Sequence, residues 1–240
     1  FQFGGLQRDF LRIVERCIEL GHEGYVITGD WDGSQPNDLT VRVVDTHALT
    51  NHGSHDKLAA QVACATASNR FDCVVGFNKI PGLDVYYAGD QCLAEKIDAN
   101  SLPIKRFLPR YRRLLQQEAS VFNSSRDTQI LLIAHLQREA FMRSYGTPAE
   151  RFSLLPPGID RDRLVRSLPN EQHRQSLRRE LGVGDGELML LQVGSGFRTK
   201  GVDRTIGALA DLPEILRSRS RLIIVGEGQS RPLRKMAKAM

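Results

Sequence analysis

The sequence lacks several features that would assign a class of protein at once. Its 240 residues contain no low-complexity tract, and no apolar run approaches the ~18 residues needed to span a bilayer. The four cysteines form no C-x-x-C pair, which argues against zinc and against a disulfide framework and favours reduced thiols. A G-x-S-x-G nucleophile elbow is also missing. Function must therefore be read from charge, element order and loops.

Basic residues exceed acidic ones. The chain has 33 Lys and Arg against 28 Asp and Glu, a formal net charge of +5. An excess of positive charge favours an anionic partner, and nucleic acid, a membrane surface and a phosphorylated substrate all fit. Because no nucleic-acid-binding motif accompanies the charge, we expect no nucleic-acid partner.

Short apolar runs alternate with helical patterns along the first two thirds of the chain. Apolar residues recur at helical spacing over residues 6–20, and Gly21 is a candidate helix stop. The expected strands are residues 25–28 (YVIT), 39–45 (LTVRVVD), 73–77 (CVVGF), 84–89 (DVYYAG) and 130–135 (ILLIAH). Strands that alternate with helices predict parallel βαβ units and an α/β fold.

A Pro-Pro-Gly turn at residues 156–158 interrupts this pattern and is typical of a linker. A polar helix is expected after it, then a strand, glycine-rich loop and helix over residues 188–212, and a strand over residues 221–228. We therefore divide the chain into a first domain (1–155) and a second domain (156–240). Two strands do not complete a doubly wound sheet, so we expect a chain truncated at both ends.

Two strand–helix junctions combine glycines with basic residues. They are Gly4-Gly5 with Arg8, and Gly194, Gly196 and Gly201 with Arg198 and Lys200. The start of a helix presents unpaired N–H groups and a partial positive charge, which suits phosphate. The second loop fits neither the Walker A pattern nor G-x-G-x-x-G. Either loop alone is explained equally well as a tight turn, but the pair favours a nucleotide held between two domains.

The segments around the second loop resemble family-4 retaining glycosyltransferases of the GT-B fold. They are LLPPGID (154–160), LLQVGSGFRTKGVDRTIGAL (190–209) and LIIVGEG (222–228). In the first domain, FGGLQRDF (3–10), NHG (51–53) and VVGFNKIPGLDVYYAGDQCLAEK (74–96) are similar to the members that glucosylate the lipopolysaccharide core. The resemblance covers nearly the whole chain. It implies two Rossmann-like domains, the first binding mainly the acceptor and the second mainly the nucleotide sugar.

The implied activity is retaining transfer of glucose from UDP-glucose to an inner-core heptose of lipopolysaccharide. Two alternatives stay open. One is another hexosyltransferase of the same family, because the glutamate pair that contacts the sugar in relatives is expected beyond Met240. The other is an inactive, truncated module that binds only membrane or phosphate.

The resemblance also assigns the donor contacts. Gly4 and Gly5 approach the phosphate and sugar of the donor, and Lys200 matches the lysine that holds its diphosphate. The arginine usual before that lysine is replaced by Thr199, and the adjacent Arg198 is a candidate substitute. Arg163 matches an arginine of the cleft.

Asp90 and Asp9 are the catalytic candidates. The resemblance places Asp90 beside the reacting sugar, where it orients the sugar or accepts the acceptor's proton, and Asp9 follows on the first helix. A surface or helix-capping role is the alternative for Asp90. No metal is expected, because the family needs none and the two D-x-D matches (30–32 and 160–162) arise easily among 28 acidic residues.

One basic stretch, residues 104–115 (IKRFLPRYRRLL), also carries apolar residues at helical spacing. Its cations are Lys105, Arg106, Arg110, Arg112 and Arg113. Such a segment suits an anionic membrane surface, although an ordinary helix packed on the sheet fits the pattern equally well, and Pro109 starts or kinks the helix. With the resemblance, it implies a cytoplasmic protein attached peripherally to the inner face of the inner membrane.

Overall fold

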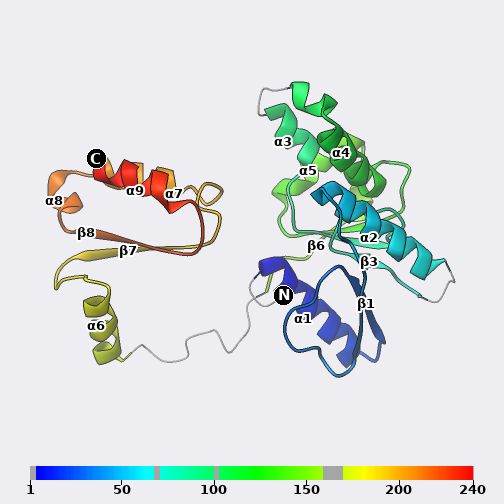
Figure 1. Cartoon of the computed structure of the whole chain (residues 1–240), viewed down its shortest axis with the longest axis horizontal. Coiled ribbons are helices and arrows are strands. Elements are labelled where there is room, and N and C mark those ends of the chain that lie inside the picture. Colours follow the sequence, from blue (N-terminus) through cyan, green and yellow to red (C-terminus); the bar gives the residue numbers. More distant parts are fainter. Residues whose placement is uncertain (1–3, 68–70, 100–102, 159–169, 240) are drawn as a thin grey trace. The chain divides into compact units, whose positions relative to one another are not determined.

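The structure, a computed structural model, describes residues 4–67, 71–99, 103–158 and 170–239. The chain forms two compact units, Phe1–Ile159 and Asp160–Met240, called here the first and second unit. Figure 1 shows the helices and strands of both units.

The first unit combines two parallel sheets with helices. Its strands are β1 (Gly24–Thr28), β2 (Leu39–Val43), β3 (Val75–Gly76), β4 (Val85–Ala88), β5 (Gln129–Leu132) and β6 (Phe152–Leu154). Strand β1 pairs with β2, and the other four form a sheet in the order β3-β4-β5-β6, with every pair parallel. The predicted α/β fold with parallel sheets is confirmed. Strand β6 was not predicted.

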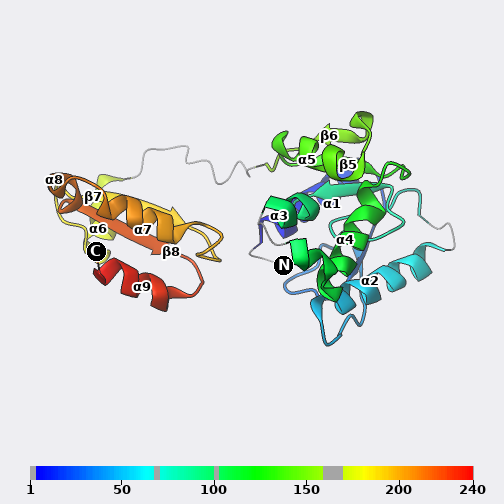
Figure 2. The ribbon, with the colours of Figure 1, turned by 90° about the horizontal axis from the view of Figure 1, so that it is seen from above.

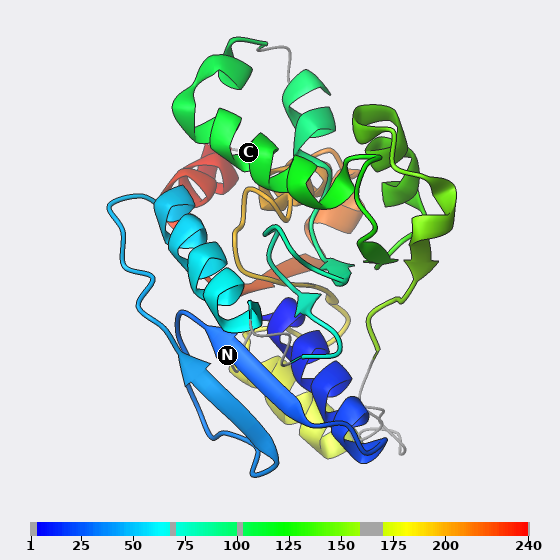
Figure 3. The same ribbon diagram turned by 90° about the vertical axis from the view of Figure 1, so that its right-hand side faces the viewer.

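The helices of the first unit connect these strands. They are α1 (Gly5–Glu19), α2 (Asn51–Thr66), α3 (Leu93–Ala99), α4 (Pro109–Phe122) and α5 (Leu136–Tyr145), with short 3-10 turns at η1 (Pro103–Phe107) and η2 (Ala149–Arg151). Helices α3, α4 and α5 contact one another and form one group (Figures 1 and 3). The predicted stop at Gly21 is confirmed: its φ is 92°, and the N–H groups of Gly21 and His22 donate to Ile18 and Cys17, which closes a Schellman motif.

The core of the first unit lies between the four-stranded sheet and this helix group. Phe122 of α4 stacks on Phe141 of α5 with ring centroids 3.7 Å apart, and Tyr86 of β4 meets Phe122 edge-on at 5.6 Å. All three rings are almost fully buried. The side chain of the buried Arg151 donates hydrogen bonds to the backbone carbonyls of Val121, Asn123 and Thr128, and so links the end of α4 to the start of β5.

The second unit contains a pair of parallel strands, β7 (Leu188–Val193) and β8 (Ser220–Val225). Its helices are α6 (Glu171–Glu180), α7 (Val202–Ala210), α8 (Glu214–Arg217) and α9 (Ser230–Ala239). Helices α7 and α9 contact each other and run along the strand pair (Figure 2). Phe197 and two residues of α7, Val202 and Ile206, form the small core of this unit, on which side chains of β8 and α9 pack.

Candidate functional site

No side chain among the described residues caps the start of α1. Gly4 is its N-cap residue with an extended backbone (φ −89°, ψ 145°), and the first turn contains no acidic residue. A Cβ added at Gly5 would meet nothing within 4 Å, whereas one at Gly4 would overlap Gln7 Oε1. Neither glycine has a positive φ. Gly5 therefore leaves space beside the helix start, and the flexible end of Gln7 takes the place that a side chain at Gly4 would occupy.

The carboxylate of Asp9, one of the two predicted catalytic residues, is held in place. The buried Tyr87 of β4 donates its hydroxyl to Asp9 Oδ2 at 2.9 Å, and Arg12 Nη1 lies 4.0 Å from the other carboxylate oxygen. Burial, then the hydrogen bond and charge of Asp9, raise the pKa of Tyr87 above its ordinary value. The phenol thus stays protonated and fixes the orientation of Asp9.

The other predicted catalytic residue, Asp90, lies just past the carboxyl end of β4. Its side chain is exposed, whereas Ala88 before it is fully buried. The intervening Gly89 packs against α1, because a Cβ added there would lie 2.8 Å from Leu6 Cδ1. The structure therefore brings the loop of Asp90 against the first turn of α1, next to Gly4 and Gly5.

The glycine-rich loop of the second unit follows β7. The φ angles of Gly194, Gly196 and Gly201 are 154°, 74° and 68°, values that residues with a side chain rarely adopt. The loop is fastened to the turn after β8: Gly194 N–H donates to Val225 O at 2.8 Å, and Gly196 N–H donates to Glu227 O at 2.7 Å. The glycines are thus required by the backbone path, unlike the pair at Gly4-Gly5.

The two basic residues of this loop, Arg198 and Lys200, are exposed, and neither forms an ion pair with another described residue. The stem of Lys200 lies over Gly194, because a Cβ added there would be 3.2–3.4 Å from three carbons of the lysine. Gln192 Nε2 donates to the carbonyl of Lys200 at 2.9 Å. The backbone is anchored while the ammonium group stays available to an anion. Arg163, the third predicted cation, lies outside the described residues.

A hollow of about 830 Å³ lies between α7, α9 and β8. Apolar side chains such as Ile206, Leu222 and Leu233 line part of it. Arg217, Arg234 and Ser230 line it as well, so its wall combines apolar side chains with two cations and a hydroxyl. The described residues contain no group of three His, Cys, Asp or Glu that could hold a metal ion.

In the basic stretch the helix begins at Pro109, which is one of the two outcomes expected for this proline. A 3-10 turn ends at Phe107 and α4 begins at Pro109, as the fixed φ of proline favours at a first helical position. Phe107 is 77% exposed and Leu108 is 47% exposed. No helix among the described residues has the length and apolar character to cross a membrane.

The five cations of this stretch differ in exposure and in whether they form ion pairs. Arg106 pairs with Asp98 at 2.6 Å, and Arg113 pairs with Asp56 at 2.8 Å. Arg110 and Arg112 are exposed and form no ion pair within the described part of the chain, and Lys105 is half-buried. Among the described residues, therefore, two of the five predicted membrane-contact cations are engaged in ion pairs.

Sequence reasoning missed three polar residues around Asp9 and Asp90. Tyr87 lies in the predicted strand DVYYAG (84–89), three residues before Asp90, so the sequence placed it near the candidate site. Its hydrogen bond to Asp9 was not predictable, because the two residues are 78 positions apart. Glu118 and Gln137 contact the loop of Asp90 from helices α4 and α5. Nothing in the sequence distinguishes them from the charged and polar residues of any exposed helix.

No protein-family model matches the chain. Among curated proteins, the chain is 40% identical to the lipopolysaccharide glucosyltransferase WaaG of Escherichia coli K12, over 100% of the chain and 64% of that protein. It is also 33% identical to a D-inositol 3-phosphate glycosyltransferase of Xylanimonas cellulosilytica, over 42% of the chain and 24% of that protein. The chain thus spans less than two thirds of the length of these relatives.

Solved structures give the same result for the fold. The crystal structure of WaaG matches with a TM-score of 0.88 at 40% identity, covering 100% of this chain and 64% of that one. An E. coli trehalose-6-phosphate protein bound with UDP-2-fluoro glucose matches with a TM-score of 0.58 at 13% identity, covering 100% of this chain and 66% of that one. The predicted resemblance to glycosyltransferases and the GT-B fold class are confirmed.

Proposed function

Because this chain resembles a lipopolysaccharide glucosyltransferase along its whole length, we propose that it belongs to a retaining, UDP-glucose-dependent glucosyltransferase of lipopolysaccharide core assembly. The sugar would pass from UDP-glucose to an inner-core heptose. The observation that carries the proposal is the 40% identity over the entire chain. The first unit would bind mainly the acceptor, and the second mainly the nucleotide sugar.

The loop over residues 194–201 is our candidate for binding the donor diphosphate. As UDP leaves, negative charge builds up on its phosphates, and fixed cations stabilise that charge. Lys200 and Arg198 supply two exposed cations on a loop whose backbone is held by β8. With these cations in place, no metal is needed for this role. Arg163 would add a further donor contact.

The end of β4 is our candidate for the reacting centre. Asp90 would orient the sugar or accept the proton of the acceptor hydroxyl. Asp9, fixed by Tyr87, would be the second carboxylate near the reaction. Gly4 and Gly5 would let the donor phosphate and sugar approach the backbone at the start of α1, where the helix dipole favours an anion.

The segment from Lys105 to Arg113 would attach the protein to the cytoplasmic face of the inner membrane, where a lipid-linked acceptor is met. The exposed Phe107 and Leu108 would enter the interface, and Arg110 and Arg112 would face anionic headgroups. Each such cation contributes about 1 kcal/mol near an anionic surface. Lys105 lies in the same segment and would add to its positive field, whereas the charges of Arg106 and Arg113 are balanced by Asp98 and Asp56.

A transfer assay tests the proposal. Full-length protein is incubated with heptose-terminated lipopolysaccharide and radiolabelled UDP-glucose, UDP-galactose or UDP-N-acetylglucosamine, with and without EDTA. We expect label from UDP-glucose alone, at a rate that EDTA leaves unchanged. Transfer of another sugar would identify a different hexosyltransferase, and no transfer from any donor would leave a binding module.

A further inference from the structure

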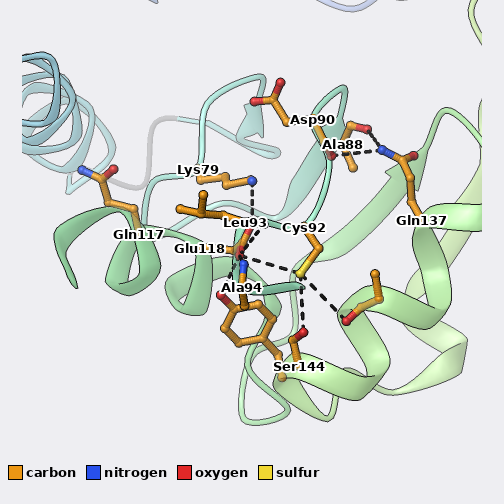
Figure 4. A network of polar contacts seen from close by, with 12 residues as sticks. Lys79, Ala88, Asp90, Cys92, Leu93, Ala94, Gln117, Glu118, Gln137 and Ser144 are labelled. Carbon is orange, nitrogen blue, oxygen red and sulfur yellow. Dashed lines mark hydrogen bonds and ion pairs between the residues drawn. The ribbon is translucent and has the colours of Figure 1, made fainter. Parts of the chain in front are cut away.

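The loop that joins β4 to α3 carries Asp90 and is anchored at both ends by side chains from other helices. Figure 4 shows these contacts around residues 88–94. One anchor, Gln137, comes from α5 and meets the loop before and at Asp90. The other, Glu118, comes from α4 and meets it where α3 begins.

Gln137 joins the ends of two neighbouring strands. Its Nε2 donates to the carbonyls of Ala88 at 3.1 Å and Asp90 at 3.0 Å, just after β4. Its Oε1 accepts from the N–H groups of Ile133 at 3.2 Å and Ala134 at 3.3 Å, just after β5. All the hydrogen-bonding capacity of one amide is thus used to hold two strand ends together. The backbone of Asp90 is fixed while its carboxylate stays free.

Glu118 is fully buried and receives hydrogen bonds from the start of α3. Its carboxylate accepts from Leu93 N–H at 3.0 Å and Ala94 N–H at 3.1 Å. Lys79 Nζ and the Tyr145 hydroxyl each lie 2.6 Å from its oxygens. A carboxylate at the start of a helix is favoured by the dipole, and the lysine balances its charge.

Every close partner of Glu118 is a donor, and this requires a carboxylate rather than an amide. A glutamine has one acceptor oxygen, so in either orientation its NH₂ group would face N–H or O–H donors. It would also leave Lys79 without its counter-charge. The network therefore specifies a charged acceptor at position 118.

We propose that Gln137 and Glu118 are positioning residues that hold the β4–α3 loop so that Asp90 meets the reacting sugar. The inference rests on the proposed function for the role of Asp90, and on the contacts above for the anchoring itself. Neither residue needs to touch substrate. Gln137 fixes the carbonyl of Asp90, and Glu118 fixes the end of the loop three residues later.

Gln137→Glu is the sharper test, because it is isosteric and its site is only half-buried. The new carboxylate still accepts from Ile133 and Ala134 but cannot donate to Ala88 or Asp90. Glu118→Gln tests the second anchor. Two exposed helix residues, Gln116 and Glu139, provide the matched controls Gln116→Glu and Glu139→Gln.

The readouts are kcat, KM for UDP-glucose, Tm, and hydrogen exchange of residues 89–94, all in the full-length protein. For Gln137→Glu we expect kcat to fall about 10- to 100-fold, as for a reacting group displaced by about 1 Å, with KM for the donor unchanged. Its Tm should stay within a few degrees of the wild type. Exchange over 89–94 should rise in both anchor variants and in neither control.

Unchanged kcat and unchanged exchange in Gln137→Glu would overturn the inference. A fall in kcat that the Gln116→Glu control reproduces would overturn it as well. If the wild type itself transfers no sugar, the proposed function fails, and the exchange measurement alone decides whether Gln137 and Glu118 hold the loop. Should Glu118→Gln fail to fold, Gln137→Glu still provides the decision.

Discussion

Replacing Gly226 with alanine should separate the candidate donor-binding loop (residues 194–201) from the turn after β8. Gly226 follows β8 with a φ of 144°, and it abuts the loop after β7. A Cβ at this position would overlap the carbonyl oxygen of Gly194 and lie 2.6 Å from its carbonyl carbon. Because both are backbone atoms, no change of rotamer relieves the overlap, and the two turns must separate.

The size of the effect follows from two costs. A side chain at such a φ costs about 1–3 kcal/mol, and overpacking against fixed atoms costs about 1–3 kcal/mol more. We therefore expect Gly226→Ala to lower the free energy of unfolding by about 2–6 kcal/mol and, at roughly 2–4 °C per kcal/mol, the Tm by about 4–24 °C. The separation also moves Gly194, over which Lys200 lies, so affinity for UDP-glucose should fall at least about tenfold.

The control is a second Gly→Ala change in the same unit. Gly207 lies in α7, and a Cβ there would have only an ordinary contact with Met236 Cε at 4.0 Å. Alanine in a helix interior is more stable than glycine by roughly 1 kcal/mol, so Gly207→Ala should melt at or above the wild-type temperature. Thermal unfolding and titration calorimetry with UDP-glucose measure both variants. A Gly226→Ala protein with wild-type Tm and donor affinity would show that Gly226 does not hold the loop after β7 in place.

Further predictions concern two exposed arginines, a buried arginine and one ion pair. Arg110→Glu with Arg112→Glu should release the protein from anionic vesicles in a sedimentation assay without changing its Tm, because both side chains are exposed; continued binding would place the membrane contact elsewhere. Arg151→Met should lower the free energy of unfolding in urea by about 3 kcal/mol or more, since it removes the donors to three backbone carbonyls; a loss below 1 kcal/mol would contradict this. Burial alone would raise the pKa of Asp56, but hydrogen bonds and charge, chiefly from Arg113, hold it below its ordinary value. The stabilisation is therefore complete above about pH 4 and is lost as pH falls through the lowered pKa. Wild type and Asp56→Asn should differ in Tm at pH 7 and converge as the pH falls below that lowered pKa; a difference in Tm that stays constant with pH would exclude the ion pair as its source.

Local rules predicted those parts of the fold that local chemistry determines. The stop at Gly21 needs only the positive φ that glycine allows, and Pro109 begins α4 because its φ suits a first helical position. Strand β6 was missed because three residues before a Pro-Pro-Gly turn carry no periodicity. The expected strand over 73–77 shrinks to Val75–Gly76, because only these two residues pair with β4.

Long-range contacts explain what the sequence could not predict about the site. The resemblance identified Asp9 and Asp90, but the partners that fix them depend on tertiary structure. Tyr87 reaches Asp9 only because β4 and α1 are neighbours in the fold. Glu118 has the sequence context of a solvated helix residue and becomes a buried acceptor only when α4 packs on the start of α3.

Calorimetric titration of Lys200→Ala with UDP-glucose measures whether the second unit binds the donor diphosphate through Lys200. The ammonium group is exposed and forms no ion pair with another described residue, so its removal should leave the Tm unchanged. We predict that UDP-glucose binds Lys200→Ala about 30-fold or more weakly, while Lys238→Ala, another exposed lysine of this unit, binds like the wild type. Equal affinity in all three proteins would show that Lys200 does not bind the diphosphate.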